Sequence, residues 1–379
     1  MSTPDTLAAV DVMTIQAQLP VPVVFGEWIM NFREFALVRV TSRAGLRGYA
    51  YTLTRDGAVA EQIRKTIAQI YVGTAVGEQE RTFTVAWRRS LASHAAGIGL
   101  RALSIVDLAC WDLAAKARDL SIAGLLGGTN RSMPATAIIG YPPATIGPQE
   151  TGAQTAALYA SGWRRFKAPI AATPERTAAR LRAARAAAPD SWLGLDAAWV
   201  YDDVEVAAEF VNSIADVGLG WFEDVFPPGN AEQLRRLRER TSTPIAMGDE
   251  QGGIYYPEAL IALKAVDVVR LDLTCMGGIT QGRRIIDQVL GAGLAFAPHM
   301  FPHIHSQVLS GLGYADAPIE WGIPFTGVHP MDDPLPQPTI VAGGRMAALV
   351  EGPGFGQLVD PEWIRSQSHL DPDGILAGL

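Results

Sequence analysis

The chain has 379 residues, of which 48% are hydrophobic and 18% are charged, and its formal net charge at pH 7 is −8. This length and apolar content predict a globular protein with one large domain and a smaller accessory domain. The acidic balance and the lack of a basic run argue against a nucleic-acid surface and indicate a small-molecule substrate.

The cysteine content and the N-terminal sequence indicate the cellular compartment of the protein. Cys110 and Cys275 are the two cysteines, which are too few for a disulfide framework and lack CxxC spacing, so a reducing compartment is expected. The first apolar stretch contains Asp5 and Asp11 and has no basic segment before it, which argues against a signal peptide. No apolar run is long enough to span a membrane. We therefore expect a cytoplasmic protein without membrane contact.

The first third of the chain is predicted to form strands and then helices. Residues 13 to about 54 alternate in strand fashion, and the turn-forming residues 42–45 separate two runs, which predicts a small antiparallel sheet. From residue 58 to about 126 the apolar residues recur at helical spacing, and two glycines then stop the last helix.

From Pro134 onward, strand-like and helix-like segments alternate over a length typical of a barrel. The expected strands are 134–140, 164–169, 192–196, 220–223, 244–247, 266–271, 294–297 and 318–320. The expected helices between them are 151–161, 174–188, 203–217, 231–240, 257–264, 279–292 and 305–312. Such alternation requires parallel strands with right-handed crossovers, and about eight of them close into a barrel. A doubly wound sheet is the alternative, but no GxGxxG or P-loop pattern follows the first strand.

Acidic residues follow three successive expected strands of this alternation: Asp196, Glu223 and Asp249. Because active sites of barrel enzymes lie at this rim, the three carboxylates are expected to converge. Without a cation they would repel one another and raise their pKa values. An all-oxygen set with room for water and substrate suits Mg²⁺ better than Zn²⁺. The alternative for each residue alone is a helix N-cap.

Asp272 and His299 occupy corresponding positions at the ends of the next two expected strands. In a parallel barrel such neighbours lie side by side at the mouth, so the carboxylate holds one imidazole nitrogen while the other faces a substrate. The pair is therefore expected to act as a catalytic base, and the alternative for His299 is a structural histidine. Arg270 shares a strand face with Asp272 and is expected to pair with the metal carboxylates or inside the barrel.

Residues 102–116, with Asp107, Trp111 and Asp112, and residues 125–127 resemble the helical signature of the mandelate racemase and muconate lactonising branch of the enolase superfamily. The resemblance covers nearly the whole chain. It implies an α+β capping domain over residues 1–130, a modified (β/α)7β TIM barrel over 131–325, and a C-terminal segment over 326–379 that completes the capping domain.

The resemblance also implies roles for particular residues. In the mandelate racemase group, the positions matching Asp272 and His299 form the dyad whose histidine is the acid/base. The position matching Glu320 supplies a hydrogen bond to the substrate carboxylate or enolate. One Mg²⁺ per subunit and a homo-oligomer, from dimer to octamer, are implied as well.

The chain departs from the family pattern at two positions. Residues 165–169 resemble the Lys-x-Lys motif, but Pro169 replaces the second lysine, which is the base on the opposite face. Where some acid-sugar dehydratases carry a histidine two residues after the first metal ligand, this chain has Ala198. His299 is then the one well-placed acid/base, and Lys167 is expected to stabilise carboxylate or enolate charge.

Several other side chains are expected near the substrate. By resemblance, two N-terminal loops at about residues 19–31 and 48–57 cap the barrel. Candidate substrate contacts are Phe25, Trp28, Tyr51, Arg55, Tyr141, Trp199 and His303. Glu250 is expected to orient Lys167 or Arg270. His303 and His305 form an HxH that raises an amidohydrolase-type metal site as a rival, but they are expected in a loop rather than on the first strand.

These expectations together favour a Mg²⁺-dependent dehydratase that converts an aldonate or aldarate to a 2-keto-3-deoxy acid, with His299 as the base. The alternatives are a cycloisomerase that opens a sugar-acid lactone or anhydro ring by β-elimination, and an epimerase that needs a second base such as Tyr141. A non-catalytic, metal-stabilised binding protein is an alternative of another class.

Overall fold

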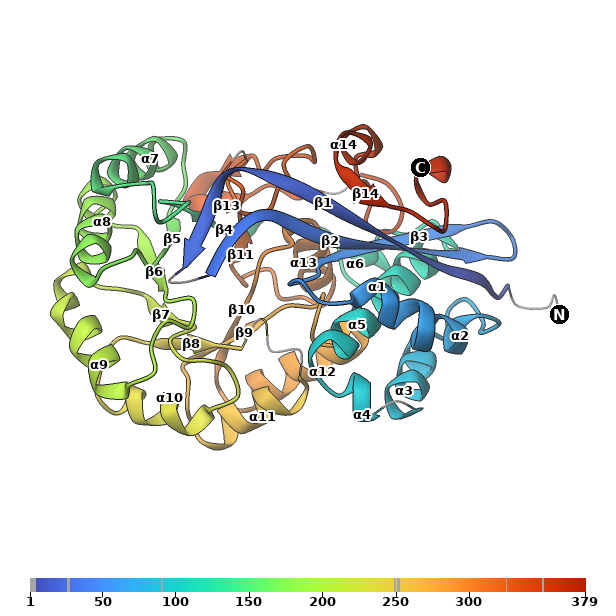
Figure 1. Cartoon of the computed structure of the whole chain (residues 1–379), viewed down its shortest axis with the longest axis horizontal. Coiled ribbons are helices and arrows are strands. Elements are labelled where there is room, and N and C mark those ends of the chain that lie inside the picture. Colours follow the sequence, from blue (N-terminus) through green and yellow to red (C-terminus); the bar gives the residue numbers. More distant parts are fainter. Residues whose placement is uncertain are drawn as a thin grey trace.

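The computed structural model describes residues 5–25, 28–89, 91–248, 250, 253–324, 326–349 and 351–379. Figure 1 shows two parts side by side: a barrel surrounded by helices, and a sheet with its own helices that carries both ends of the chain. No helix in these described ranges is long and apolar enough to cross a membrane.

The N-terminal sheet is antiparallel, as the sequence predicts. Its strands are β1 (Leu7–Phe25), β2 (Trp28–Ser42) and β3 (Arg47–Leu53), and β14 (Ser368–Leu370) pairs with the outer side of β1. The far end of the β1–β2 hairpin extends across the barrel (Figure 1). The expected capping loop at 19–31 is therefore strand in its described residues, because cross-strand pairing continues to Phe25 and Trp28.

Helices follow the sheet. They are α1 (Val59–Gln62), the π-helix η1 (Ile63–Ile67), α2 (Ala68–Tyr71), α3 (Gln79–Arg89), α4 (Leu91–His94), α5 (Gly97–Lys116) and α6 (Ile122–Leu125). Every residue of α5 from Gly99 to Ala115 is buried, since the helix lies between β3 and the barrel helix α12. Gly48 allows the close approach of β3, because a Cβ there would lie 2.2 Å from the Ala109 carbonyl oxygen.

The barrel has parallel strands in the order β10-β9-β8-β7-β6-β5-β4-β11. The strands are β4 (Met133–Ile138), β5 (Arg165–Pro169), β6 (Trp192–Asp196), β7 (Trp221–Glu223), β8 (Ile245–Met247), β9 (Val268–Leu271), β10 (Ala295–Pro298) and β11 (Ile319–Trp321). The helices between them are α7 (Pro148–Ala160), α8 (Pro174–Ala187), α9 (Val204–Ser213), α10 (Ala231–Arg238), α11 (Tyr255–Ala262), α12 (Gly278–Gly291) and α13 (Pro302–Gly311). The predicted strand–helix alternation and barrel class are confirmed.

The alternation was readable because the barrel strands are covered on both faces and are therefore short apolar runs. Helix starts are marked by side-chain caps: Thr173 begins α8, Asp203 begins α9 and Asn230 begins α10. All strand C-terminal ends meet at one mouth, over which the β1–β2 hairpin lies (Figure 1).

After β11 the chain first pairs antiparallel with the start of β4, at residues 345–346, and then returns to the N-terminal sheet. The remaining elements are β12 (Ile340–Val341), η3 (Ala342–Gly344), β13 (Arg345–Met346), α14 (Pro361–Ser366), β14 and η4 (Leu376–Gly378). Asp373 accepts hydrogen bonds from the Val12 amide at 3.0 Å and from Arg64 at 3.2 Å, which ties the C-terminus to β1 and η1. The C-terminal residues therefore belong physically to the sheet that overhangs the barrel mouth.

Candidate active site

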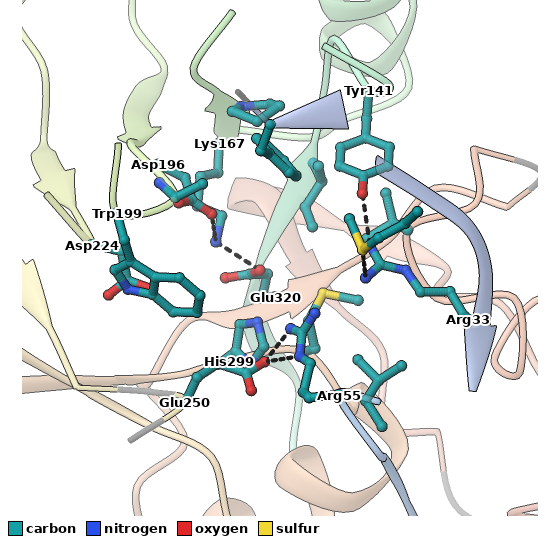
Figure 2. A pocket seen from close by; sticks show the side chains of 18 of the residues that line it. Arg33, Arg55, Tyr141, Lys167, Asp196, Trp199, Asp224, Glu250, His299 and Glu320 are labelled. Atoms are coloured by element: carbon teal, nitrogen blue, oxygen red, sulfur yellow. Dashed lines mark hydrogen bonds and ion pairs between the residues drawn. The ribbon is translucent and has the colours of Figure 1, made fainter. Parts of the chain in front are cut away.

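A cavity lies at the barrel mouth beneath the hairpin (Figure 2). Its lining includes nine of the predicted catalytic, substrate-binding and metal-binding residues: Phe25, Trp28, Arg55, Tyr141, Lys167, Asp196, Trp199, His299 and Glu320. Non-glycine residues with left-handed backbone gather at this rim, at Ala198 and Trp199 after β6 and at Met300 and Phe301 after β10. Such strained positions persist where the surrounding structure holds them, commonly at functional sites.

Lys167 lies at the centre of a buried network of carboxylates on the floor of the cavity. Its Nζ is 2.8 Å from Glu320, 3.2 Å from Glu223 and 3.3 Å from Asp196. Arg270 lies on the other side, with its Nε 2.8 Å from Glu223 and its Nη2 bonded to Glu320. The expected placement of Arg270 within the barrel is thus observed, and it contacts one predicted metal carboxylate directly.

The charged groups in this network shift the pKa values of one another. Burial raises the pKa of Glu223 to about 7, against the opposing effects of Arg270 and Lys167. Burial also acts on Glu320, but Lys167 and Arg270 outweigh it and lower its pKa to about 2. For Lys167, burial disfavours the charged form, yet the carboxylates of Glu223, Glu320 and Asp196 raise its pKa above the usual value. Lys167 is therefore a cation, suited to stabilising negative charge and not to removing a proton.

The oxygen atoms around Glu223 fit a divalent cation. Glu223 is fully buried, and its Oε2 has no hydrogen-bond partner among the described residues. Asp196 follows on the neighbouring strand, paired in register with Glu223. Such an orphaned buried carboxylate oxygen beside a second carboxylate is what a hard cation satisfies. The third predicted ligand, Asp249, lies outside the described residues.

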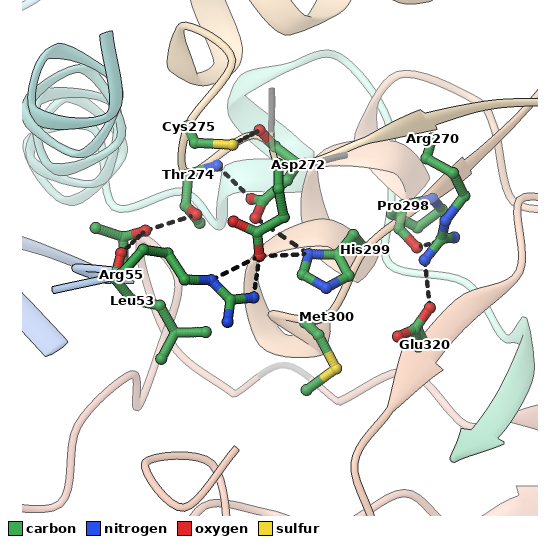
Figure 3. Close-up of polar contacts among 12 residues, drawn as sticks. Leu53, Arg55, Arg270, Asp272, Thr274, Cys275, Pro298, His299, Met300 and Glu320 are labelled. Atoms are coloured by element: carbon green, nitrogen blue, oxygen red, sulfur yellow. Dashed lines mark hydrogen bonds and ion pairs between the residues drawn. The ribbon is translucent and has the colours of Figure 1, made fainter. Parts of the chain in front are cut away.

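Asp272 and His299 form the predicted pair (Figure 3). Asp272 Oδ2 lies 3.4 Å from His299 Nδ1, and Asp272 Oδ1 accepts the Thr274 amide at 2.7 Å. The His299 amide donates to the Leu271 carbonyl at 2.7 Å, which holds the residue at the end of β10. Because Nδ1 faces the buried Asp272, Nε2 lies on the opposite edge of a ring that lines the cavity.

Glu250 does not contact Lys167 or Arg270, contrary to the expectation. It accepts from Arg55 Nε at 3.1 Å and from Arg101 Nη2 at 2.6 Å, and its Oε1 lies 3.7 Å from His299 Nδ1. Burial opposes its ionisation, but Arg55, Arg101 and His299 hold its pKa well below the usual range. Arg55 is long enough to reach the barrel rim, so the pairing joins the capping part to the catalytic end of the barrel.

Glu250, Asp272 and His299 also form a group whose ligand atoms lie within 4.8 Å of one another. Two guanidinium groups already neutralise Glu250, and Asp272 is engaged with the His299 ring and a backbone amide. This group is therefore better explained as a hydrogen-bonded acid–imidazole cluster than as a metal centre, whereas at Asp196 and Glu223 one buried oxygen, Oε2 of Glu223, has no partner among the described residues.

Two predicted substrate contacts do not line the cavity. Tyr51 is fully buried, and its hydroxyl is bonded to Asp332. His303 lies in α13, not in a loop, and its Nε2 is 2.9 Å from the Pro336 carbonyl. Both side chains are held by the C-terminal segment, Tyr51 through Asp332 and His303 through Pro336, which alternation alone does not reveal.

The HxH does not form a metal site. His305 is buried in α13: its Nε2 accepts the Leu273 amide at 3.0 Å, so its Nδ1 carries the proton and donates to the Met300 carbonyl at 2.6 Å. Burial lowers the pKa of both His303 and His305, which keeps them neutral. His305 instead supports the loop that follows Asp272.

Sequence reasoning missed Arg33, a residue of β2 that lines the cavity and donates to the Tyr141 hydroxyl at 2.7 Å. The sequence did contain a sign of this role. Arg33 lies two and four residues before the buried Phe35 and Leu37, on the same face of the strand, so a charged side chain occupies an inward position.

A parallel barrel with carboxylates and an acid–imidazole pair at its mouth defines a class of metal-assisted enzymes. The model described as mandelate racemase / muconate lactonizing enzyme, N-terminal domain, matches residues 9–127, and the model described as enolase C-terminal domain-like matches residues 150–363. The chain therefore belongs to the mandelate racemase and muconate lactonizing branch of the enolase superfamily, as the sequence resemblance indicated.

Several known proteins and solved structures are similar to this chain. The L-rhamnonate dehydratase of Saccharopolyspora erythraea is 28% identical, with 86% of this chain and 83% of that protein covered. The D-galactarolactone cycloisomerase of Agrobacterium fabrum is 26% identical, with 81% and 85% covered. Among solved structures, the L-talarate/galactarate dehydratase of Salmonella typhimurium is 21% identical with a TM-score of 0.83, covering 97% of this chain and 94% of that one. A racemase from Streptomyces coelicolor, solved with bound magnesium, gives 0.84 at 21% identity, covering 96% and 100%.

Proposed function

We propose that the protein is a Mg²⁺-dependent acid-sugar dehydratase in which His299 is the sole general acid/base. The observation that carries this proposal is the Asp272–His299 pair on one side of the cavity, with Pro169 at the position of the second base. The names of the relatives, which include an L-rhamnonate dehydratase, a D-galactonate dehydratase family member and an L-talarate/galactarate dehydratase, support the reaction class.

Asp196 and Glu223 would hold the cation together with Asp249, the last as an expectation from the sequence. The orphaned Oε2 of Glu223 supports this set. When bound, Mg²⁺ would withdraw electron density from the substrate carboxylate and so acidify the neighbouring C–H bond.

The residues of the chain supply the proton chemistry. His299 takes the proton from C2 through Nε2, while Asp272 holds Nδ1–H and stabilises the imidazolium. The positive charge of Lys167 stabilises the negative charge that develops on the substrate, and the ionised Glu320, which is paired with Lys167 and Arg270, holds the lysine in position. The C3–O bond then breaks, and the imidazolium returns its proton to the departing hydroxyl. Water leaves, and the resulting enol becomes a 2-keto-3-deoxy acid.

Proton NMR in D₂O with a library of acid sugars tests the proposal. We expect loss of water from at least one aldonate or aldarate, and a fall in kcat of about 10²–10⁴-fold in His299→Asn, the range for a general acid/base. His369→Asn is the matched control, since His369 is exposed on β14. Full turnover in His299→Asn would refute the role of His299, and binding without α-proton exchange would indicate a non-catalytic protein.

A cycloisomerase is the second candidate, because β-elimination that opens a ring also needs a single acid/base, and one relative carries that name. The same spectra distinguish the reactions: dehydration produces a keto acid lighter by one water, whereas ring opening produces an isomer of the lactone. Exchange at C2 with inversion and without elimination would indicate an epimerase.

A further inference from the structure

Arg33 is a buried guanidinium on the capping side of the cavity. Its residue is 7% exposed and reaches the cavity from β2, next to Tyr141 and Arg55. In Figure 2, Arg33 and Tyr141 lie on one side of the cavity, and Asp196 and Trp199 lie on the other. The positive charge of Arg33 therefore lies opposite one of the predicted metal ligands.

The hydrogen-bond partners of Arg33 are all neutral. Its Nη2 donates to the Tyr141 hydroxyl at 2.7 Å, its Nη1 contacts the Met30 sulfur at 3.2 Å, and its Nε contacts the Gly327 carbonyl at 3.5 Å. Within the described ranges, no carboxylate lies within ion-pairing distance of this guanidinium. A guanidinium has five N–H groups, so donors remain for a ligand.

The neighbouring arginines differ from Arg33 because each of them is paired with a carboxylate. Arg55 and Arg101 both pair with Glu250, so one carboxylate already serves two guanidinium groups. Tyr141 cannot supply the missing anion either, because burial raises the pKa of its phenol and keeps it neutral. This end of the cavity therefore has an excess of positive charge.

The surroundings make that excess unfavourable without a ligand. Met30, Ile138 and Val328 line the cavity beside Arg33 and provide an apolar environment. Burial lowers the pKa of the Arg33 guanidinium, but an arginine remains protonated in proteins. A buried charge of this kind is stabilised by an opposite charge that is itself hydrogen-bonded.

We propose that Arg33 binds the second carboxylate of a dicarboxylic sugar acid, so that the substrate is an aldarate and not an aldonate. The proposal rests on the proposed dehydratase function. One carboxylate of the substrate goes to the acidic, Lys167-containing end of the cavity, and the distal carboxylate goes to Arg33. Tyr141 accepts its hydrogen bond from Arg33 and can donate its own hydroxyl proton to the same distal carboxylate. The terminal hydroxymethyl group of an aldonate carries no charge to neutralise Arg33.

Galactarate and galactonate are suitable probes, because they share the configuration at C2–C5 and differ in the group at C6. We expect kcat/KM for galactarate to exceed that for galactonate by about 30-fold or more, as for a charge-assisted hydrogen bond. Glucarate and gluconate form a second matched pair. A ratio below about threefold in both pairs would overturn the proposal.

Three variants separate charge from packing. Arg33→Met should bring the ratio close to one, mainly through a higher KM for the diacid, whereas Arg33→Lys should retain part of the preference. Tyr141→Phe should reduce the ratio by a smaller factor. Arg43→Met, at an exposed position of the turn after β2, is the control and should leave the ratio unchanged. An unchanged ratio in Arg33→Met refutes the assignment, and if that variant does not fold, the Lys and Phe variants decide.

Calorimetric binding to His299→Asn keeps this test independent of the proposed function. We expect galactarate to bind this variant at least tenfold more tightly than galactonate, and the preference to be lost when Arg33→Met is added. If no acid sugar is dehydrated but this preference holds, the dehydratase proposal fails and the diacid site stands. If galactonate is dehydrated as well as galactarate and binds equally, the diacid site fails and the dehydratase proposal stands.

Discussion

Asp272 Oδ2 lies 3.4 Å from His299 Nδ1, and the two residues directly follow the neighbouring parallel strands β9 and β10. The parallel pairing of β9 with β10 brings both strand ends to the same edge, so 26 intervening residues do not separate the pair in space. Of the two residues, only His299 lines the cavity, and Asp272 supports its ring from the Nδ1 side (Figure 3).

Asp272→Asn should lower kcat by about 10²–10³-fold while KM changes by less than threefold, because Asp272 positions His299 and does not line the cavity. Steady-state kinetics on the substrate found by NMR, together with α-proton exchange in D₂O, measure this split. Asp190→Asn, at an exposed position after α8, is the control. If the variant lost thermal stability as well as kcat, the result would instead indicate a structural role for Asp272.

Pro169→Lys should introduce proton exchange on the second face of the substrate. Pro169 ends β5, lines the cavity and is paired in register with Asp196, so a lysine there would lie beside the carboxylates that we propose as metal ligands. We expect deuterium incorporation into the C2 epimer to rise at least tenfold above the wild-type rate. The exposed Pro189→Lys is the matched control, and incorporation equal in both variants would argue that Pro169 does not occupy the second-base position.

Glu223→Gln should weaken Mg²⁺ binding by at least about 10-fold, since it removes the charge of a buried carboxylate whose Oε2 lacks a partner in the described structure. Calorimetric titration with Mg²⁺ measures the affinity directly, and chelation should abolish turnover of the wild type. Glu209→Gln, at an exposed position of α9, serves as the control. Unchanged Mg²⁺ affinity would remove Glu223 from the ligand set.

Glu250→Gln should destabilise the protein by about 3 kcal/mol, because it leaves two buried or half-buried guanidinium groups without their carboxylate. Urea unfolding measures this loss. A double-mutant cycle with Arg101→Met isolates the pair: the two changes should be strongly non-additive. Additive losses would show that the Arg101–Glu250 contact at 2.6 Å contributes little.

Asp107→Asn should remove a pH dependence of stability. Asp107 accepts the Thr280 amide at 3.0 Å and the Thr280 hydroxyl at 2.6 Å, and burial raises its pKa from 3.8 to about 7. Because the folded-state pKa is raised, the stabilising contribution of the protonated acid is complete below about pH 3.8 and is lost as the pH rises through 7.

The asparagine mimics the protonated acid at every pH. The unfolding free energy of Asp107→Asn relative to the wild type should therefore increase between pH 5 and pH 8, by at most about 1.4 kcal/mol per pH unit. Urea titrations at four pH values measure the difference. Parallel pH curves for the two proteins would contradict the proposed titration of Asp107.

The strands and helices of the barrel could be predicted closely because most of the strands are short, largely apolar runs, and several helices begin at a capping side chain. The segment 19–31 was predicted less well. The family resemblance implied a loop there, but cross-strand pairing with β2 extends the strand to Phe25. Tyr51 and His303, predicted to line the substrate cavity, do not line it, because Asp332 and Pro336 of the distant C-terminal segment hold their side chains.

The sequence by itself determined the family, the barrel, and the order in which Asp196, Glu223, Asp272 and His299 follow their strands. These features depend on local periodicity and on residue types at strand ends, which are legible along the chain. Only the tertiary structure decided which charges remain unbalanced. Glu250 neutralises Arg55 and Arg101, whereas Arg33 reaches the same cavity from β2 with neutral partners. Charge compensation depends on distances between segments far apart in the chain, so it becomes visible only when the hairpin lies over the barrel mouth.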